Sequence, residues 1–222
     1  MLKTIAVIPA RGGSKRLPNK NIKLLNGKPL LVHSIDYANA HSFIDEVYVT
    51  TDSIEIKEIA LQYGAKVIER PKSLSGDLEP TITAIKHVIE NVSNDVENII
   101  LLQPTNPLRP KNLLEQAFSF FNKKKITSLF TVSRNHDKLG TINNNIFTPF
   151  NYKVGQRSQD LQPLFFENGL LYITKKKLIK QDVIISKNAY PFEVKHPFGN
   201  VDIDDQNDFD YANYLSKKHS ED

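Results

Sequence analysis

The chain has 222 residues, of which 40% are hydrophobic, and it carries a formal net charge of +4 and no cysteine. This length suits a single α/β domain with a substantial core, and the absence of cysteine excludes disulfides and thiolate zinc sites. No apolar run approaches the ~20 residues of a membrane-spanning helix and no signal pattern precedes the first strand, so we expect a cytoplasmic protein without a membrane partner. The small, dispersed charge suits an anionic small substrate at least as well as nucleic acid, and nucleic-acid binding would require a basic stripe interleaved with aromatic residues, so we expect no nucleic-acid partner.

The first predicted strand, residues 4–8, leads into a loop rich in glycine and positive charge, residues 9–21. The strand is short, β-branched and apolar, as expected of a buried strand. In the loop, two glycines let backbone N–H groups turn inward, and Ser14 adds a hydroxyl. The cations that can offset the charge of a polyphosphate are Arg11, Lys15, Arg16 and Lys20. The alternative interpretation is a solvated basic turn.

Two common phosphate-binding motifs are missing from this loop. A P-loop places its Lys directly before a Ser or Thr, whereas here Ser14 precedes Lys15. The dinucleotide fingerprint G-x-G-x-x-G is also absent, which argues against NAD or FAD. A phosphate site in this loop would therefore depend on cationic side chains.

The next elements alternate between helix and strand. A turn at residues 26–29 precedes a predicted helix over 30–40, and a strand is predicted over 47–51. Asp52 and Glu55 have the spacing of a capping box for a helix that ends at Tyr63, which favours a structural role for Asp52 over ligand contact.

A third strand, residues 66–69, opens into a long polar loop that begins at Arg70 and ends where a helix resumes at Pro80 or Thr81. Loops at strand ends of open α/β sheets are where ligands usually bind. The most apolar strand, residues 99–102, is predicted at the sheet centre. The proline-rich segment after it is stiff and suits the wall of a cleft.

A helix over residues 111–121 and a strand over 128–132 continue the alternation, which predicts a three-layer α/β/α fold with a mostly parallel sheet. Residues 134–167 show no clear period and exceed a usual connection, so we expect a lid or an arm that contacts another subunit. After them we predict strands over 169–173 and 201–204, and a helix over 206–217.

Asp202 and Asp204 flank an apolar residue in the last predicted strand. In an extended strand two such side chains point to the same side, roughly 6.5 Å apart. The carboxylates would repel each other by about 2–3 kcal/mol unless a cation such as Mg²⁺ lay between them. The alternative is that Asp204 or Asp205 caps the following helix and Asp202 is merely exposed.

Five segments together resemble the acylneuraminate cytidylyltransferases, the CMP-sialic acid synthetases. The first loop fits the pattern A-R-x-x-S-K-x-x-x-x-K-N through Ala10, Arg11, Ser14, Lys15, Lys20 and Asn21. Residues 101–109 resemble L-L-Q-P-T-S-P-L-R, with Asn106 in place of the usual Ser. The other matching segments are Arg70 with Asp77 and Thr81, residues 168–173 (N-G-A-I-Y-I in the family), and the D-I-D of residues 202–204.

The resemblance spans nearly the whole chain and implies a Rossmann-like nucleotidyltransferase, with residues 1–222 as one domain and 134–167 as a dimerisation or lid insertion. It implies a Mg²⁺-dependent reaction of CTP with a nine-carbon 2-keto-3-deoxy sugar acid of the N-acetylneuraminate type. The products would be a CMP-sugar and pyrophosphate, made by a homodimer. Legionaminic or pseudaminic acid is the alternative substrate, and a non-catalytic nucleotide-binding domain is a further alternative.

The same resemblance implies roles for particular residues. Arg11, Lys20, Asp202 and Asp204 would be catalytic, and the two aspartates would also bind Mg²⁺. The nucleotide would contact Ala10, Arg11, Ser14, Lys15, Lys20, Asn21, Arg70 and Thr81. Gln103 and Arg157 are expected on the sugar side. The family often has cations near the positions of Gly140 and Phe166, and their absence here leaves the identity of the sugar open.

Overall fold

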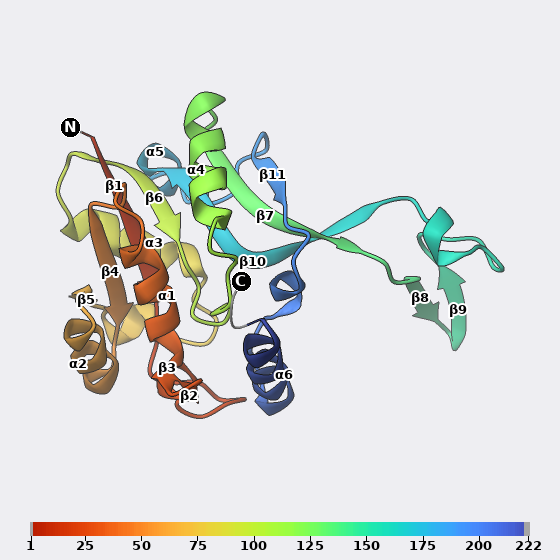
Figure 1. Ribbon diagram of the computed structural model, residues 1–222, viewed down its shortest axis with the longest axis horizontal. Coiled ribbons are helices and arrows are strands. Elements are labelled where there is room, and N and C mark those ends of the chain that lie inside the picture. The colour runs from red at the N-terminus through yellow and green to blue at the C-terminus, as the bar shows by residue number, and fades with distance from the viewer. Residues whose placement is uncertain (1, 220–222) are drawn as a thin grey trace.

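A seven-stranded sheet forms the centre of the protein, in the order β11-β7-β10-β6-β1-β4-β5 (Figure 1). The structure is a computed structural model that describes residues 2–219. The strands of this sheet are β1 (Lys3–Pro9), β4 (Glu46–Thr51), β5 (Lys66–Glu69), β6 (Val96–Leu101), β7 (Ser128–Asn135), β10 (Leu164–Lys175) and β11 (Tyr190–Glu193). The helices are α1 (Leu30–Asn39), α2 (Ile54–Gln62), α3 (Thr81–Asn91), α4 (Leu113–Lys123), α5 (Lys176–Ile179) and α6 (Gln206–Lys218).

The sheet is mostly parallel, which confirms the fold class predicted from the alternation of strands and helices. Strands β6, β1, β4 and β5 run parallel to one another, and β11 runs parallel to β7. Within residues 2–219, only β10 of this sheet is antiparallel to its neighbours, β6 and β7. The apolar strand β6 lies in the middle of the sheet, as predicted.

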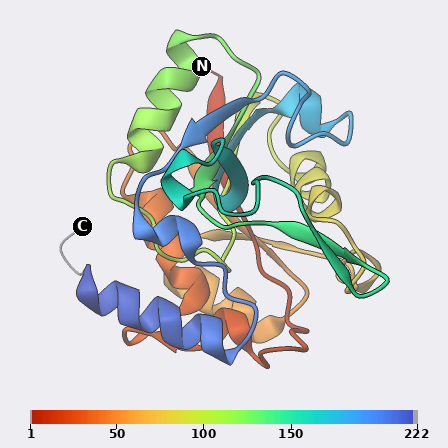
Figure 2. The same ribbon diagram turned by 90° about the vertical axis from the view of Figure 1, so that its right-hand side faces the viewer.

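Helices cover both faces of the sheet and make three layers (Figure 2). Strand β1 contributes apolar side chains to both faces of the sheet, because successive side chains along a strand point to opposite faces. Its Ala6 and Ile8 pack with α1, α2 and α4 on one face. Ile5 and Val7 pack with α3 and α5 on the other face. Full burial on both faces explains why this segment is a continuous apolar run.

A third apolar cluster joins the two ends of the chain. Leu17 and Leu25, from the region after β1, pack with Ile203 and with Phe209 of α6. Between Leu17 and α1 lie the short helix η1 (Lys20–Ile22) and a hairpin of β2 (Leu24–Leu25) and β3 (Lys28–Pro29). This cluster holds the first loop against the segment that carries Asp202 and Asp204.

Two local predictions are wrong. Helix α2 is capped by Ser53, whose hydroxyl accepts from the N–H of Ile56, so Asp52 is free to accept from the N–H of Gly12 at 3.0 Å. Residues 201–204 form no strand, because their backbone groups bond to Lys20, Thr105 and Asn106 rather than to a neighbouring strand. Helix α6 is capped by Asp205, which leaves Asp202 and Asp204 without a capping role.

Residues 136–163 form an arm that extends away from the rest of the protein (Figure 1). The arm is more regular than predicted: β7 and β10 continue into its base, and β8 (Gly140–Asn143) pairs with β9 (Ile146–Pro149). Asn144 and Asn145 make the hairpin turn with φ of 50° and 63°. Among the described residues, the longest helix is α6 with 13 residues, and no helix is long and apolar enough to cross a bilayer.

Candidate active site

A pocket of about 260 Å³ lies at the carboxyl ends of β1, β5 and β6. This edge is where open α/β sheets bind their ligands. The pocket is lined by Pro9, Arg11, Ser14, Lys20, Asn21, Arg70, Gly76, Asp77, Glu79, Thr81, Gln103, Pro104 and Thr105. A second hollow of about 320 Å³ shares several of these residues and adds Lys15, Arg16 and Asp204. The structure therefore brings most of the predicted nucleotide residues together.

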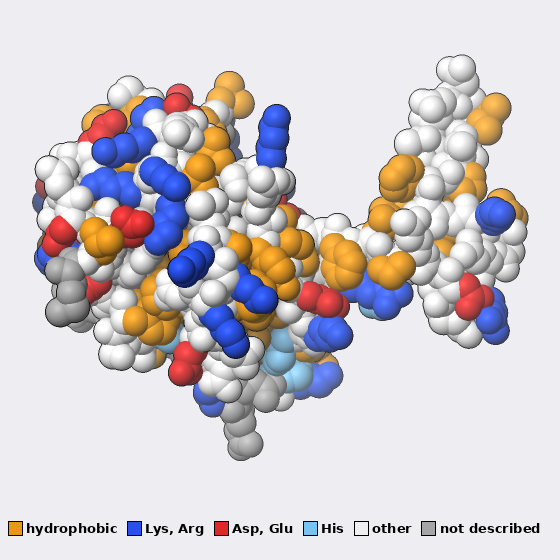
Figure 3. Space-filling view, turned by 90° about the horizontal axis from the view of Figure 1, so that it is seen from above, with side chains coloured by type: hydrophobic (Ala, Val, Ile, Leu, Met, Phe, Trp, Pro, Cys, Tyr) orange, Lys and Arg blue, Asp and Glu red, His pale blue; other side chains and the backbone are white. Residues whose placement is uncertain are grey.

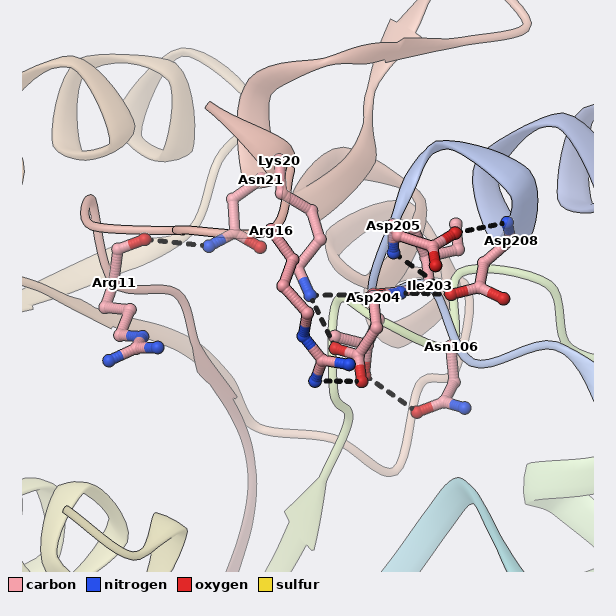
Figure 4. Close-up of polar contacts among 10 residues, drawn as sticks. Arg11, Arg16, Lys20, Asn21, Asn106, Ile203, Asp204, Asp205 and Asp208 are labelled. Carbon is pink, nitrogen blue, oxygen red and sulfur yellow. Dashed lines mark hydrogen bonds and ion pairs between the residues drawn. The ribbon is translucent and has the colours of Figure 1, made fainter. Parts of the chain in front are cut away.

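The loop after β1 is held in place by one hydrogen bond to strand β4 and one within the loop. The N–H of Ala10, which is fully buried, bonds to the carbonyl of Thr50, and Asn21 donates from Nδ2 to the carbonyl of Arg11 at 2.9 Å (Figure 4). Gly12 lies so close to the start of α2 that a Cβ atom there would be 2.9 Å from Ser53 Cβ. A larger residue at position 12 would push the loop away from Asp52.

Every cation of the predicted phosphate loop faces a carboxylate. Arg11 pairs with Asp77 at 2.8 Å, and Lys15 pairs with the other oxygen of the same carboxylate. The hydrogen bond from Lys15 and that from Arg11 hold the pKa of Asp77 below its usual value. Arg16 and Lys20 pair with Asp204 at 2.7 and 3.1 Å (Figure 4). These carboxylates lie where anionic oxygens of a ligand would be stabilised.

The segment that carries the two aspartates is fixed by hydrogen bonds to Lys20 of η1 and to the loop after β6. Lys20 donates from Nζ to the carbonyl of Ile203 at 2.7 Å, and the N–H of Ile203 bonds to the carbonyl of Thr105 at 2.8 Å. Buried Asn106 donates from Nδ2 to the carbonyl of Val201 at 2.7 Å and to that of Asn168 at 3.0 Å. The predicted juxtaposition of this segment with the first loop is therefore present, although not in a strand.

The negative charge of Asp202 is less compensated by nearby cations than that of Asp204, which pairs with Arg16 and Lys20. Partial burial raises the pKa of Asp202, and the negative charge of Asp204 adds to the rise. No set of three or more His, Asp or Glu side chains that could hold a metal ion occurs within residues 2–219. A cation at Asp202 and Asp204 would therefore need water and ligand oxygens to complete its coordination, as Mg²⁺ often has.

Arg70 supplies buried donors that find no acceptor in the protein. It is 8% exposed, and its Nε and Nη2 atoms have no hydrogen-bond partner among the described residues. Burial lowers the pKa of its guanidinium. Since a buried unsatisfied donor costs roughly 1–3 kcal/mol, a ligand acceptor in the pocket would stabilise this side chain. Thr81, the first residue of α3, lines the same pocket.

Gln103 reaches the pocket from the proline-rich loop, which is held by a fully buried arginine. Arg109 donates to the carbonyls of Gln103 and Leu170 at 2.9 and 2.6 Å, and to the hydroxyl of Ser34 at 3.0 Å. Burial lowers the pKa of Arg109 to about 10. Arg109 therefore shapes the wall of the pocket from behind.

The structure does not bring Arg157 to the pocket of its own chain. Arg157 lies in the arm, where it pairs with Asp160 at 2.7 Å, and it lines neither hollow. Conversely, sequence reasoning missed that Asp77 meets Arg11 and Lys15. The sequence gives little sign of this contact, because Asp77 is separated from both cations by four strands and two α-helices.

The fold and the pocket together define a nucleotide-binding α/β protein whose site is lined by both cations and carboxylates. A sequence model described as cytidylyltransferase matches residues 5–220. The chain belongs to the cytidylyltransferase family, which confirms the resemblance drawn from its motifs.

Several curated relatives are similar to the chain. A pseudaminic acid cytidylyltransferase of Campylobacter jejuni is 34% identical over 99% of both chains. A CMP-N,N'-diacetyllegionaminic acid synthase of Legionella pneumophila is 34% identical over 91% of both chains. An N-acylneuraminate cytidylyltransferase of Streptococcus agalactiae is 31% identical over 94% of this chain, which spans only 52% of that relative's length.

A solved structure of CMP:2-keto-3-deoxy-manno-octonic acid synthetase in complex with CTP has the same fold. It matches with a TM-score of 0.74 over 97% of this chain and 99% of the other, at 18% identity.

Proposed function

We propose that this protein transfers CMP from CTP to a nine-carbon 2-keto-3-deoxy sugar acid of the N-acetylneuraminate type and releases pyrophosphate. The observation that carries the proposal is the meeting of Lys20 with Asp204 at 3.1 Å, because it joins the cationic first loop to the paired aspartates. The family membership and the named activities of the relatives support it.

In this reaction the anomeric hydroxyl of the sugar attacks the α-phosphorus of CTP. The new bond joins that oxygen to phosphorus, the bond from phosphorus to the pyrophosphate oxygen breaks, and the hydroxyl proton passes to water. Catalysis of such a step is mostly positioning and charge stabilisation. Arg11, Ser14, Lys15 and Lys20 bind the triphosphate, and Arg11 and Lys20 stabilise the leaving group. Ala10 contacts the nucleotide through its backbone, and Asn21, Arg70 and Thr81 contact the nucleoside.

The cofactor of this proposal is Mg²⁺, held by Asp202 and Asp204. The two carboxylates suit it, because Asp202 is exposed to solvent, its negative charge and that of Asp204 repel each other, and Mg²⁺ accepts few protein ligands. When bound, Mg²⁺ neutralises phosphate charge and favours ionisation of the attacking hydroxyl. With the carboxylate of Asp204 on the metal ion, Arg16 and Lys20 would be available to bind phosphate oxygens.

The sugar side of the proposal includes Gln103 and, from a second subunit, Arg157. We propose a homodimer in which the arm reaches the neighbouring subunit, because the arm exposes apolar side chains (Figure 3). Its large exposed hydrophobic residues are Leu139, Ile142, Ile146, Phe147, Phe150 and Val154. Size-exclusion chromatography with light scattering tests this: a monomer at assay concentration would contradict it. The cytoplasmic location remains a prediction.

The same reaction with pseudaminic or legionaminic acid is the alternative. It is favoured by the two relatives of 34% identity that match over nearly their full length. Pyrophosphate release from CTP, measured with each purified acid in turn, distinguishes the three substrates by their kcat/KM values.

The test of the proposed reaction compares wild type with Asp202→Ala in this pyrophosphate assay. Wild type should release pyrophosphate only when CTP, Mg²⁺ and an acidic sugar are all present, and the variant should be slower by roughly 100-fold or more. Asp182→Ala is the control, since Asp182 is an exposed aspartate that pairs with Lys86 away from the pocket. No release with any acid, or full activity of Asp202→Ala, would refute the proposal.

A further inference from the structure

Strand β10 contains an irregular stretch that changes which side chains share a face. Glu167 lies opposite Val132 of β7, and Tyr172 lies opposite Phe130, so five positions on β10 correspond to two on β7. In a regular strand, residues five apart point to opposite faces. Residues that lie directly opposite each other in paired strands point to the same face of the sheet. Phe130 and Val132, two apart on β7, also point to the same face as each other. The bulge therefore places their partners Tyr172 and Glu167 on one side of the sheet.

Buried polar contacts hold this bulge in place. Gly169 has a φ of +73°, which favours glycine, and a Cβ atom there would lie 2.6 Å from Asn106 Oδ1. Asn168 accepts from the hydroxyl of Thr131 at 2.6 Å and donates to that of Ser133 at 2.9 Å. The motif Asn168-Gly169 thus fixes a backbone shape, and the consequence of that shape is the pairing of Glu167 with Tyr172.

The phenol of Tyr172 connects Glu167 to the pocket. Its Oη donates to Glu167 Oε1 at 2.5 Å, because a carboxylate can only accept. Burial, followed by the hydrogen bond to Glu167, raises the pKa of Tyr172, so the phenol keeps its proton. The hydroxyl of Tyr172 therefore donates its only proton to Glu167. Toward its other neighbour, Gln103 Nε2 at 3.5 Å, the Oη atom can act only as an acceptor.

This arrangement determines how the side-chain amide of Gln103 is oriented. If the amide were flipped, its oxygen would face the lone pairs of Tyr172 Oη, which is repulsive. The amide nitrogen of Gln103 therefore faces Tyr172, and its Oε1 is the atom left to accept from a ligand in the pocket that Gln103 lines. The backbone of Gln103 is fixed separately, by Arg109 Nη2 at 2.9 Å.

We propose that Glu167 and Tyr172 are positioning residues that hold Gln103 Oε1 as a hydrogen-bond acceptor for a hydroxyl or amide N–H of the acidic sugar. This inference rests on the proposed function for the identity of the ligand. Its first part, the orientation of the Gln103 amide, concerns the protein alone and is tested without substrate.

The first experiment records the side-chain amide signals of glutamine in ¹H–¹⁵N NMR spectra of ligand-free protein, with Gln103→Ala to assign the pair from Gln103. Tyr172→Phe and Glu167→Gln should both shift this pair. Tyr48→Phe is the matched control, because Tyr48 donates to Glu46 at 2.6 Å in a contact outside the pocket, and it should leave the pair unchanged. Unchanged Gln103 signals in Tyr172→Phe would overturn the inference whether or not the protein turns over CTP.

The second experiment is a double-mutant cycle in steady-state kinetics with CTP and the best acidic sugar. Tyr172→Phe should raise the KM for the sugar about 10-fold and change the KM for CTP less than about 2-fold. Glu167→Gln should raise the sugar KM about 3-fold, because glutamine can still accept from Tyr172 but can also donate to it.

The double variant Tyr172→Phe/Gln103→Ala should be no worse than Gln103→Ala alone, since Tyr172 acts through Gln103. Additive effects of the two substitutions, or equal effects on both KM values, would overturn the inference. Absence of turnover by wild type with every acid would instead refute the proposed function, and the NMR result would still decide the orientation of Gln103.

Discussion

Asn106 gives the sharpest prediction about stability, because its side chain ties the aspartate segment to the sheet. It is 1% exposed, and its Nδ2 donates to the carbonyls of Val201 and Asn168 at 2.7 and 3.0 Å. Asn106→Ala leaves two buried carbonyls without donors, at about 1–3 kcal/mol each. We expect a total loss of about 2–4 kcal/mol, which for a chain of this length lowers the melting temperature by roughly 4–16 °C.

The assay is urea and thermal unfolding followed by circular dichroism, with Mg²⁺ titration of pyrophosphate release as a second readout. Asn106→Ser should be intermediate in stability, because a hydroxyl has a single proton and serves one carbonyl only. Asn91→Ala is the control: its side chain also donates to a carbonyl, that of His87, but the contact is exposed and its loss should cost less than about 0.5 kcal/mol. Stability of Asn106→Ala within 0.5 kcal/mol of wild type would refute the argument that these two bonds hold the segment.

Three further predictions concern the same region. Gly169→Ala should destabilise the fold by roughly 1–3 kcal/mol in urea unfolding, because its φ of +73° and the contact with Asn106 both oppose a Cβ atom; an unchanged midpoint would contradict this. Asp77→Asn removes a carboxylate that competes with phosphate for Arg11 and Lys15, so calorimetry should show several-fold tighter binding of CTP and little change for cytidine; weaker CTP binding would contradict it. The folded-state pKa of Asp202 is raised above 3.8, so ionisation of Asp202 lowers the stability of the fold as the pH rises through the pKa. Asp202→Asn should therefore melt at a higher temperature than wild type at pH 7 in EDTA. A lower melting temperature of the variant would contradict this prediction.

The regular part of the fold could be predicted because local pattern and tertiary environment agree there. The apolar run at residues 4–8 is buried on both faces, and β6 is central, as its composition indicates. The antiparallel direction of β10 was not predictable in the same way, because a buried strand shows the same apolar run whichever way it points. Its direction follows from the long excursion of the arm, which returns the chain beside β7.

The sequence predicted which residues belong to the site better than it predicted which residues they contact. Motif spacing identified the first loop and the aspartates, but Asp52 and Ser53 are adjacent candidates for the same cap, and spacing alone cannot choose between them. Residues 201–204 were expected as a strand from their alternation, yet their hydrogen bonds go to Lys20, Thr105 and Asn106, which are distant in sequence. The turn at Asn144 and Asn145 carried a local signal, since asparagine tolerates positive φ.

Strand β10 also has a mechanical consequence. One unbroken stretch of backbone runs from the base of the arm at Leu164, past Glu167 and the bulge, to Tyr172 beneath the pocket. We expect a displacement of the base of the arm to reach the amide of Gln103 through this strand, whereas the first loop follows β1, on the other side of β6. Substitutions that disturb the arm should therefore reduce the selectivity for the sugar acid more than they reduce the affinity for CTP.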